Sequence, residues 1–231
     1  MGYRIDPRQP TDVEVRRVLA EQLGRGAAAL RAEGGPDAEA VHDVRKQLKK
    51  SRSVLRLARA DLGPAVARHA NGELRRVGAD LALQRDADSL VEAVERLLSP
   101  ASDPDGDHSA PVTADPATRQ ALGVVHEMLV ARAERVRSHG ALDRSTVIGA
   151  ARTLEQTLAW LQLVPAQVTG WDALAPGFTR QYRRGRTALR SLPDQPTVDE
   201  LHEWRKRVKD MWYHQRLLRR LWTGAQRPIV A

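Results

Sequence analysis

The hydrophobic residues recur at intervals of three and four positions and are interrupted by Gly and Pro, a pattern typical of amphipathic helices. Thr11 or Asp12 is a suitable N-cap for the first helix, and Gly34-Gly35-Pro36 is a suitable stop. Gly63-Pro64 ends the second helix. We therefore predict helices over about 11–31, 37–62, 65–98, 117–138, 143–163, 173–191 and 197–223.

Residues 99–116, "SPASDPDGDHSAPVTADP", have no periodicity and are rich in Pro, Asp and Ser. Such a composition predicts a loop, and this one separates two helical halves at about 11–98 and 117–223. The fold class predicted for the chain, 1–231, is all-α: a single domain of two antiparallel helical bundles.

The two halves share a basic motif. Residues 41–57 read "VHDVRKQLKKSRSVLRL", and a shift of 160 positions aligns them with "LHEWRKRVKDMWYHQRL" at 201–217. The His-x-x-Arg-x-x-x-Lys register is the same in both copies. This internal duplication predicts two bundles related by a pseudo-two-fold axis, with the basic helices facing each other across a central groove.

On a helix, the cations of the first copy fall within an arc of roughly 80°, opposite an apolar face. That cationic stripe contains His42, Arg45, Lys49, Arg52 and Arg56. The apolar face contains Val44, Leu48, Ser51, Leu55, Ala58 and Leu62. Like charges at this spacing repel one another, so an anion that runs along the helix would stabilise the stripe.

The second copy has the same two faces. His202, Arg205, Lys209 and Arg216 form its stripe, with Trp212 among them. Trp204, Val208, Met211, Leu218 and Trp222 lie opposite. Each stripe is roughly 20 Å long, which suits several successive phosphates better than one carboxylate.

The formal net charge of +8 favours a polyanionic partner: nucleic acid, anionic lipid or polyphosphate. The chain has no Cys, which excludes disulfides and thiolate chemistry, and the His residues show no metal-ligand spacing. No run of about 18 apolar residues occurs, so we expect a soluble, cytoplasmic protein.

Each feature has a purely structural interpretation as well. A charge run is usually a solvated face, although two copies in one register make this less favourable. Trp212 could stack on a nucleic-acid base or pack at the edge of the groove. The "RRGR" segment at 183–186 could be an ordinary wet surface, and Arg85 could pair with Asp86 or Asp88.

Taken together, "VHDVRKQLKKSR", "GADLALQRDADSL" and "LHEWRKRVKDMWY" resemble the conserved histidine α-helical domain, or CHAD, family over about residues 11–223. The resemblance implies two four-helix bundles about a pseudo-two-fold, a basic central groove and binding of inorganic polyphosphate, with association to polyphosphate granules. Some members are fused to a catalytic triphosphate tunnel domain, and this sequence shows no such domain.

The resemblance and the two stripes give one set of candidate residues for polyphosphate binding. They are His42, Arg45, Lys46, Lys49, Arg52, Arg56, Arg85, Arg183, Arg186, His202, Arg205, Lys206, Lys209 and Arg216. We predict no catalytic residue, metal or cofactor. The alternatives are a nucleic-acid-binding helical protein and an accessory protein of phosphoryl transfer or polyphosphate hydrolysis.

The second copy departs from the family pattern. Asp210 stands where the first copy has Lys50, and Trp212 where it has Arg52. Family members usually continue with a closing helix after the second motif, and little sequence follows Trp222. We therefore expect an exposed apolar strip around Trp204, Met211 and Trp222, covered by another subunit.

Overall fold

The structure is a computed structural model that describes residues 2–33, 35–81, 90–91, 93–95, 97–98, 115–140 and 144–221. Within these ranges every regular element is a helix, so the all-α prediction is confirmed. The elements are α1 (Thr11–Leu30), α2 (Ala38–Leu57), α3 (Arg59–Leu62), α4 (Pro64–Asp80), α6 (Pro116–Gly140), α7 (Arg144–Leu163), the 3-10 helix η1 (Trp171–Ala173), α8 (Ala175–Arg190) and α9 (Val198–Leu218).

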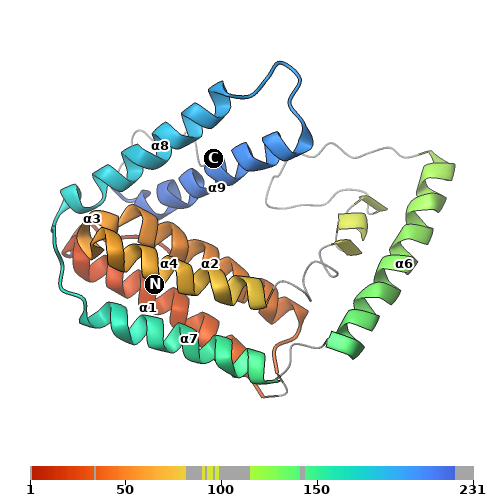
Figure 1. Cartoon of the computed structure of the whole chain (residues 1–231), viewed down its shortest axis with the longest axis horizontal. Helices are drawn as coiled ribbons and strands as arrows, with labels where there is room; N and C mark the ends of the chain where they lie inside the picture. Colours follow the sequence, from red (N-terminus) through yellow and green to blue (C-terminus); the bar gives the residue numbers. More distant parts are fainter. Residues whose placement is uncertain are drawn as a thin grey trace.

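Helices α1, α2, α4 and α7 pack into one bundle around the apolar core (Figure 1). Close approach is possible where α1 has Gly26, because a Cβ there would lie 3.2 Å from Leu154 of α7. The sequence prediction assigned 143–163 to the second half, yet α7 packs against α1 and α4. The contacts of this bundle therefore cross the boundary predicted at 99–116.

Two predicted helices have different bounds. The helix predicted over 65–98 is wrong as one continuous element, because α4 ends at Asp80 with Leu81 as its C-cap. Leu81 is fully buried, and its carbonyl accepts a hydrogen bond from Arg45 of α2. The helix predicted over 37–62 is divided at Ala58 into α2 and the short α3, and Gly63, at a φ of 84°, ends α3.

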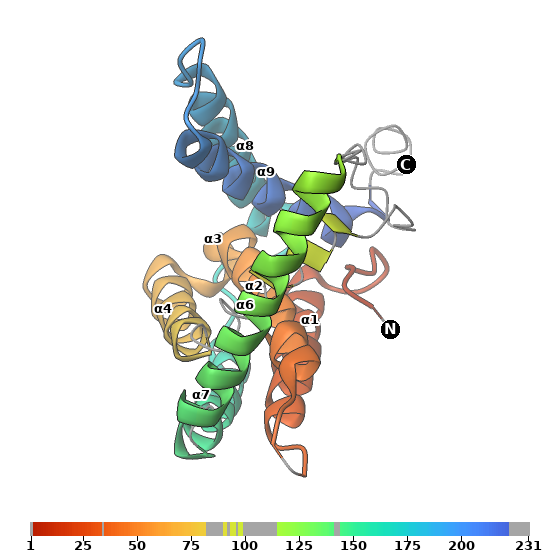
Figure 2. The ribbon, with the colours of Figure 1, turned by 90° about the vertical axis from the view of Figure 1, so that its right-hand side faces the viewer.

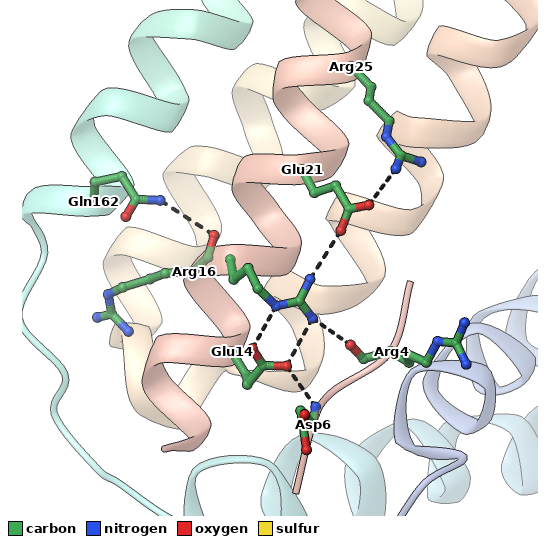
Figure 3. A network of polar contacts seen from close by, with 8 residues as sticks. Arg4, Asp6, Glu14, Arg16, Glu21, Arg25 and Gln162 are labelled. Carbon is green, nitrogen blue, oxygen red and sulfur yellow. Dashed lines mark hydrogen bonds and ion pairs between the residues drawn. The ribbon is translucent and has the colours of Figure 1, made fainter. Parts of the chain in front are cut away.

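Charged side chains fasten the N-terminal segment to α1 (Figure 3). The Arg17 guanidinium donates to the Glu14 carboxylate at 2.6 Å, to Glu21 at 3.1 Å and to the carbonyl oxygen of Arg4 at 2.7 Å. Glu14 also accepts from the backbone N–H of Asp6 at 2.7 Å. These hydrogen bonds, above all the one from Arg17, lower the pKa of Glu14 and keep it ionised although it is buried.

Helices α8 and α9 form an antiparallel hairpin that projects from the bundle (Figure 2). Its base rests on α2, where Gly177 lies so close to Leu57 that a Cβ would overlap the carbonyl group of that residue. The imidazole Nε2 of the buried His214 lies 3.0 Å from the carbonyl oxygen of Ser53. The hairpin is therefore attached to the bundle mainly through α2.

The shift of 160 positions also relates the helix bounds. Residues 38 and 57, the ends of α2, correspond to 198 and 217, and α9 runs over 198–218. Residues 11 and 30, the ends of α1, correspond to 171 and 190, where η1 begins and α8 ends. The duplication of a two-helix hairpin is thus present in the structure, while the pseudo-two-fold relating two whole bundles stays a prediction.

Helix α6 lies apart from the bundle in Figure 1 and contributes no residue to the main core cluster, and the imidazole Nε2 of its His126 lies 3.1 Å from a carboxylate oxygen of Glu95. Among the residues that the structure describes, no helix is sufficiently long and apolar to cross a membrane.

Candidate functional site

Helix α2 presents the first cationic stripe on one face because its opposite, apolar face is buried in the core. Asp37 caps the helix by accepting a hydrogen bond of 2.7 Å from the backbone N–H of Ala40. The predicted apolar positions of α2 are all buried, as are Ala58 and Leu62 beyond its end. Those six residues are Val44, Leu48, Ser51, Leu55, Ala58 and Leu62.

Two arginines of the first stripe form hydrogen bonds with other residues of the bundle. Arg45 Nη1 donates to the carbonyl oxygens of Gly78 at 3.1 Å and Leu81 at 3.3 Å, so its charge lies at the C-terminal end of α4. Arg52 Nε donates to the side-chain oxygen of Asn71 at 3.0 Å. The partners in these contacts are backbone carbonyls and a side-chain amide, which carry no net charge.

The remaining cations of α2 face outward to different extents. His42 is half-buried and Lys49 is exposed. Lys46 is exposed and forms an ion pair of 3.1 Å with Asp43 one turn earlier. A pair of this kind between exposed side chains contributes little stability and leaves the lysine accessible.

Arg56 connects the two motif helices. Its guanidinium forms an ion pair with the carboxylate of Asp210 on α9. The amide nitrogen of Gln181 on α8 lies 3.4 Å from the other oxygen of that carboxylate. The acid that replaces the lysine of the first copy therefore holds α2, α8 and α9 together.

A group of cations surrounds this junction, and we call it the α2/α9 cationic cluster. It consists of Lys50, Arg52 and Arg56 of α2 with Lys209 and Arg216 of α9. Burial, followed by repulsion from Arg216, lowers the pKa of Lys50. Burial, followed by repulsion from Arg56, lowers the pKa of Arg52. Asp210 is the carboxylate that faces Arg52 and Arg56, and it offsets only part of the positive charge.

Aromatic rings line the same junction. Lys209 Nζ lies 5.5 Å and Arg216 Cζ 4.5 Å from the ring centre of Trp212. Trp212 packs edge-on against Tyr213, which in turn packs edge-on against Tyr3. The ring of Trp212 is thus already in contact with two cations of the chain, which favours the packing interpretation over stacking on a base.

The two stripes meet only at their C-terminal parts. In Figure 2 the α1–α2 and α8–α9 turns lie at opposite ends of the molecule, so α2 and α9 diverge from their crossing toward their N-termini. His202, Arg205 and Lys206 are exposed on the projecting part of α9. The central groove shared by the whole of both stripes is therefore not confirmed.

Sequence reasoning missed part of the basic surface. Arg180 and Arg184 of α8 and Arg207 of α9 line an open groove of about 960 Å³ together with the predicted Arg183. Arg186 is exposed on α8 outside the groove lining. The sequence signal was the composition of α8, which contains five arginines and no acidic residue. Lys50, which lies near Arg216 in the cluster, was not among the predicted residues.

The apolar face of the second copy is only partly covered. Val208 is 44% exposed, Trp204 and Met211 are half-buried, and only Leu218 of the described positions is buried. No further helix of the described chain packs on α9 as α4 packs on α2. Arg85 and Trp222 lie outside the described residues, so their predicted roles stay predictions.

No group of three or more metal-binding side chains occurs in the part of the chain that the structure describes. No curated protein and no solved structure matches the chain significantly. The sequence model of the CHAD domain, however, matches residues 12–231. With its two His-x-x-Arg-x-x-x-Lys helices joined at a cationic junction, the chain belongs to the CHAD domain family.

Proposed function

We propose that this protein binds inorganic polyphosphate on the cationic faces of α2 and α9, centred on the α2/α9 cationic cluster. CHAD domains are known to bind polyphosphate, which supports this choice of polyanion. The carrying observation is the crossing of the two motif helices, where Arg56 of α2 pairs with Asp210 of α9 and cations of the two helices come close enough to repel one another.

An anion relieves the electrostatic strain of this arrangement. Lys50, Arg52 and Arg56 are partly withdrawn from water, and burial lowers the pKa of each of them. A phosphate oxygen beside them replaces lost hydration with charge-assisted hydrogen bonds. The cluster is therefore better suited to an anion than a fully hydrated row of surface lysines.

The shape of the surface fits an extended anion. From the crossing, Lys46 and Lys49 continue along α2, while Arg205 and Lys206 continue along α9. Successive phosphates of one chain can contact several of these cations and release condensed counterions. The proposed activity is binding without a chemical step, and in a cell that stores polyphosphate the same surface would recruit the protein to granules.

The test is a competition titration with labelled long-chain polyphosphate at ~0.15 M salt, a concentration at which surface charges are strongly screened. Single-stranded and duplex nucleic acid serve as competitors. The test variant is Lys209→Gln with Arg216→Gln, because both cations contact Trp212 at the junction. The matched control is Arg144→Gln with Arg152→Gln, which removes the same charge from exposed positions of α7.

We expect polyphosphate to bind in preference to nucleic acid, and the junction variant to lose about tenfold in affinity. The control variant should lose much less. Equal loss in the two variants would show that net charge alone is measured, and would reject the site. Displacement by nucleic acid at equal phosphate concentration would favour the nucleic-acid alternative.

The enzymatic alternative needs a separate measurement. Polyphosphate hydrolysis would release inorganic phosphate and, in most phosphoryl-transfer enzymes, would need a divalent metal. Incubation of the protein with polyphosphate, with and without Mg²⁺, should release no phosphate above a protein-free control. Magnesium-dependent release that the junction variant lacks would replace our proposal with a catalytic one.

A further inference from the structure

The arginine-lined groove between α8 and α9 differs chemically from the junction of the motif helices. Its walls carry Arg180, Arg183, Arg184 and Arg207. Most of the remaining lining is apolar and comes from small residues of α8 such as Ala175 and Ala188. Apart from the hydroxyls of Thr179 and Thr187, the groove offers apolar surface beside guanidinium groups, which suits a ligand that is apolar on one side and acidic at its flanks.

The charge of these four arginines is balanced only in part within the described residues, by the interaction of Arg207 with Glu203. Helix α8 contains no Asp or Glu, and none of the four arginines forms an ion pair with another described residue. Burial lowers the pKa of Arg180, and repulsion from Arg59 and Arg184 adds to this effect. A carboxylate placed in the groove would therefore meet several uncompensated cations.

The internal duplication indicates what kind of element could occupy the α8/α9 groove. When shifted by 160 positions, Ala175, Thr179, Arg183 and Thr187 correspond to Val15, Leu19, Leu23 and Ala27 of α1. The four α1 residues are buried in the bundle that α1 forms with α2 and α7. All four α8 residues are exposed. In the first hairpin a helix lies against this surface, and in the second hairpin the surface is open.

We infer that the α8/α9 groove binds an amphipathic helix of a partner protein, whose apolar face is flanked by Asp and Glu. The apolar floor favours a helix over polyphosphate, because a bare phosphate chain gains nothing from Ala and Pro side chains. The arginine walls add charge complementarity, which selects an acidic helix. This inference is independent of the proposed polyphosphate site on α2 and α9.

The described helices of the chain itself are poor occupants. Helices α2, α4, α6, α7, α8 and α9 each contain more Lys and Arg than Asp and Glu. Helix α1 is balanced, and its Glu14 and Glu21 already pair with Arg17 and Arg25. Because docking of a second copy through these helices would bring like charges together, the occupant is a separate, acidic protein segment.

The probe is a synthetic helix of 20 residues, the length of α7. It has Leu and Ala at the spacing of the buried α7 positions Val147, Ala150, Ala151, Leu154 and Leu161, and Glu on both flanks. One control peptide has Gln in place of Glu, and another keeps Glu but has Ser in place of Leu. Binding to the full chain is measured by fluorescence anisotropy.

The protein variant is Arg183→Gln with Arg184→Gln, and the matched control is Arg186→Gln with Arg190→Gln on the same helix but outside the groove lining. All four side chains are exposed, so both variants should fold, which circular dichroism checks. We expect the acidic amphipathic peptide to bind wild type and the control variant alike, and to bind the groove variant about tenfold more weakly. Both control peptides should bind at least about tenfold more weakly than the probe.

Absence of peptide binding, or equal binding of the Gln-flanked peptide, would overturn the inference. So would a groove variant that loses polyphosphate affinity as the Lys209→Gln, Arg216→Gln variant is expected to do, because the groove would then belong to the polyphosphate surface. Failure of the proposed function has a different signature, since it is measured with polyphosphate on variants of α9 that leave α8 unchanged.

Discussion

The α1–α2 hairpin and the α8–α9 hairpin are two copies of one element, and the surroundings of the copies differ. In the first copy, α4 and α7 cover the apolar face, and Val41, Val44 and Leu48 are at most 4% exposed. In the second copy, the equivalent Leu201 and Val208 are 42% and 44% exposed. The same helix spacing therefore produces a core in one place and an open surface in the other.

The arginines of the two hairpins also differ in their surroundings: those of the first hairpin have more partners within the fold. In α1, Arg16, Arg17 and Arg25 all pair with carboxylates: Asp61, Glu14 and Glu21. Figure 3 shows two of these carboxylates, Glu14 and Glu21, with Arg25 paired to Glu21. The arginines of α8 have no acid within their helix. The arginines of α1 form ion pairs within the fold, whereas those of α8 form none with another described residue.

The largest expected effect concerns the attachment of the second hairpin. Position 177 is Gly, and the equivalent position of α1 is Arg17. A Cβ at 177 would overlap the backbone of Leu57, so Gly177→Ala should separate α8 from α2 and cost about 3 kcal/mol of unfolding free energy. Urea denaturation measures this loss.

Gly149→Ala is the control for that substitution. No atom lies within 4 Å of the Cβ position at Gly149 of α7, so alanine there should stabilise the protein by about 0.5–1 kcal/mol through its helix propensity. If Gly177→Ala behaves like Gly149→Ala, then α8 does not rest on α2 as described.

The junction of the hairpins should be sensitive to acid. Burial lowers the pKa of His214 to about 4, below its ordinary value of 6.5. The unfolded chain therefore takes up the proton first, and stability that is complete above pH 6.5 falls as the pH drops toward 4. We expect a loss of about 2–3 kcal/mol at pH 4.

The equivalent residue of the first copy, Val54, supplies the matched variant. His214→Val should remove this part of the pH dependence, so that the difference between wild type and variant changes between pH 7 and 4. Urea titrations at several pH values provide the comparison. A constant difference would mean that His214 is not buried in its neutral form.

Much of this fold follows from the sequence. The pattern of apolar positions and the Gly and Pro stops located most helix ends within a few residues, and Thr197 with Glu200 forms the capping box that begins α9. The end of α4 was not predicted because tertiary contacts, and no local sequence signal, end this helix. Leu81 is held in the core and its carbonyl by Arg45, and neither contact has a local signal.

The sequence predicted which types of residue form the candidate site, but it did not predict how the two helices that carry them are arranged. Periodicity placed the cations on one face of each helix, and it could not show that α2 and α9 cross near Arg56 and diverge beyond. Nor could it show that α7 joins the first hairpin, because a helix can pack against any apolar face of matching shape. The role of Asp210 was visible only once Arg56 lay beside it.

The difference in coverage can be measured with one substitution made in each copy. Val44→Ala removes volume from the closed core and should cost about 2 kcal/mol. Val208→Ala, on the open face of α9, should cost less than about 0.5 kcal/mol. Thermal or urea unfolding at two protein concentrations measures both. A large, concentration-dependent loss at Val208 would show instead that another subunit covers this face, as the sequence first indicated.

A smaller effect on stability than that of Val44→Ala is expected at Asp210, which stands where the first copy has Lys50. Asp210→Asn removes the partner of the mostly buried Arg56 and should cost about 1–2 kcal/mol, whereas Asp43→Asn, which breaks the exposed pair with Lys46, should cost less than about 0.5 kcal/mol. The same change leaves the α2/α9 cationic cluster without its carboxylate, so polyphosphate should bind Asp210→Asn more tightly even though the protein is less stable. Opposite signs in unfolding and binding measurements would separate the two roles of the residue, since a merely structural aspartate would weaken both.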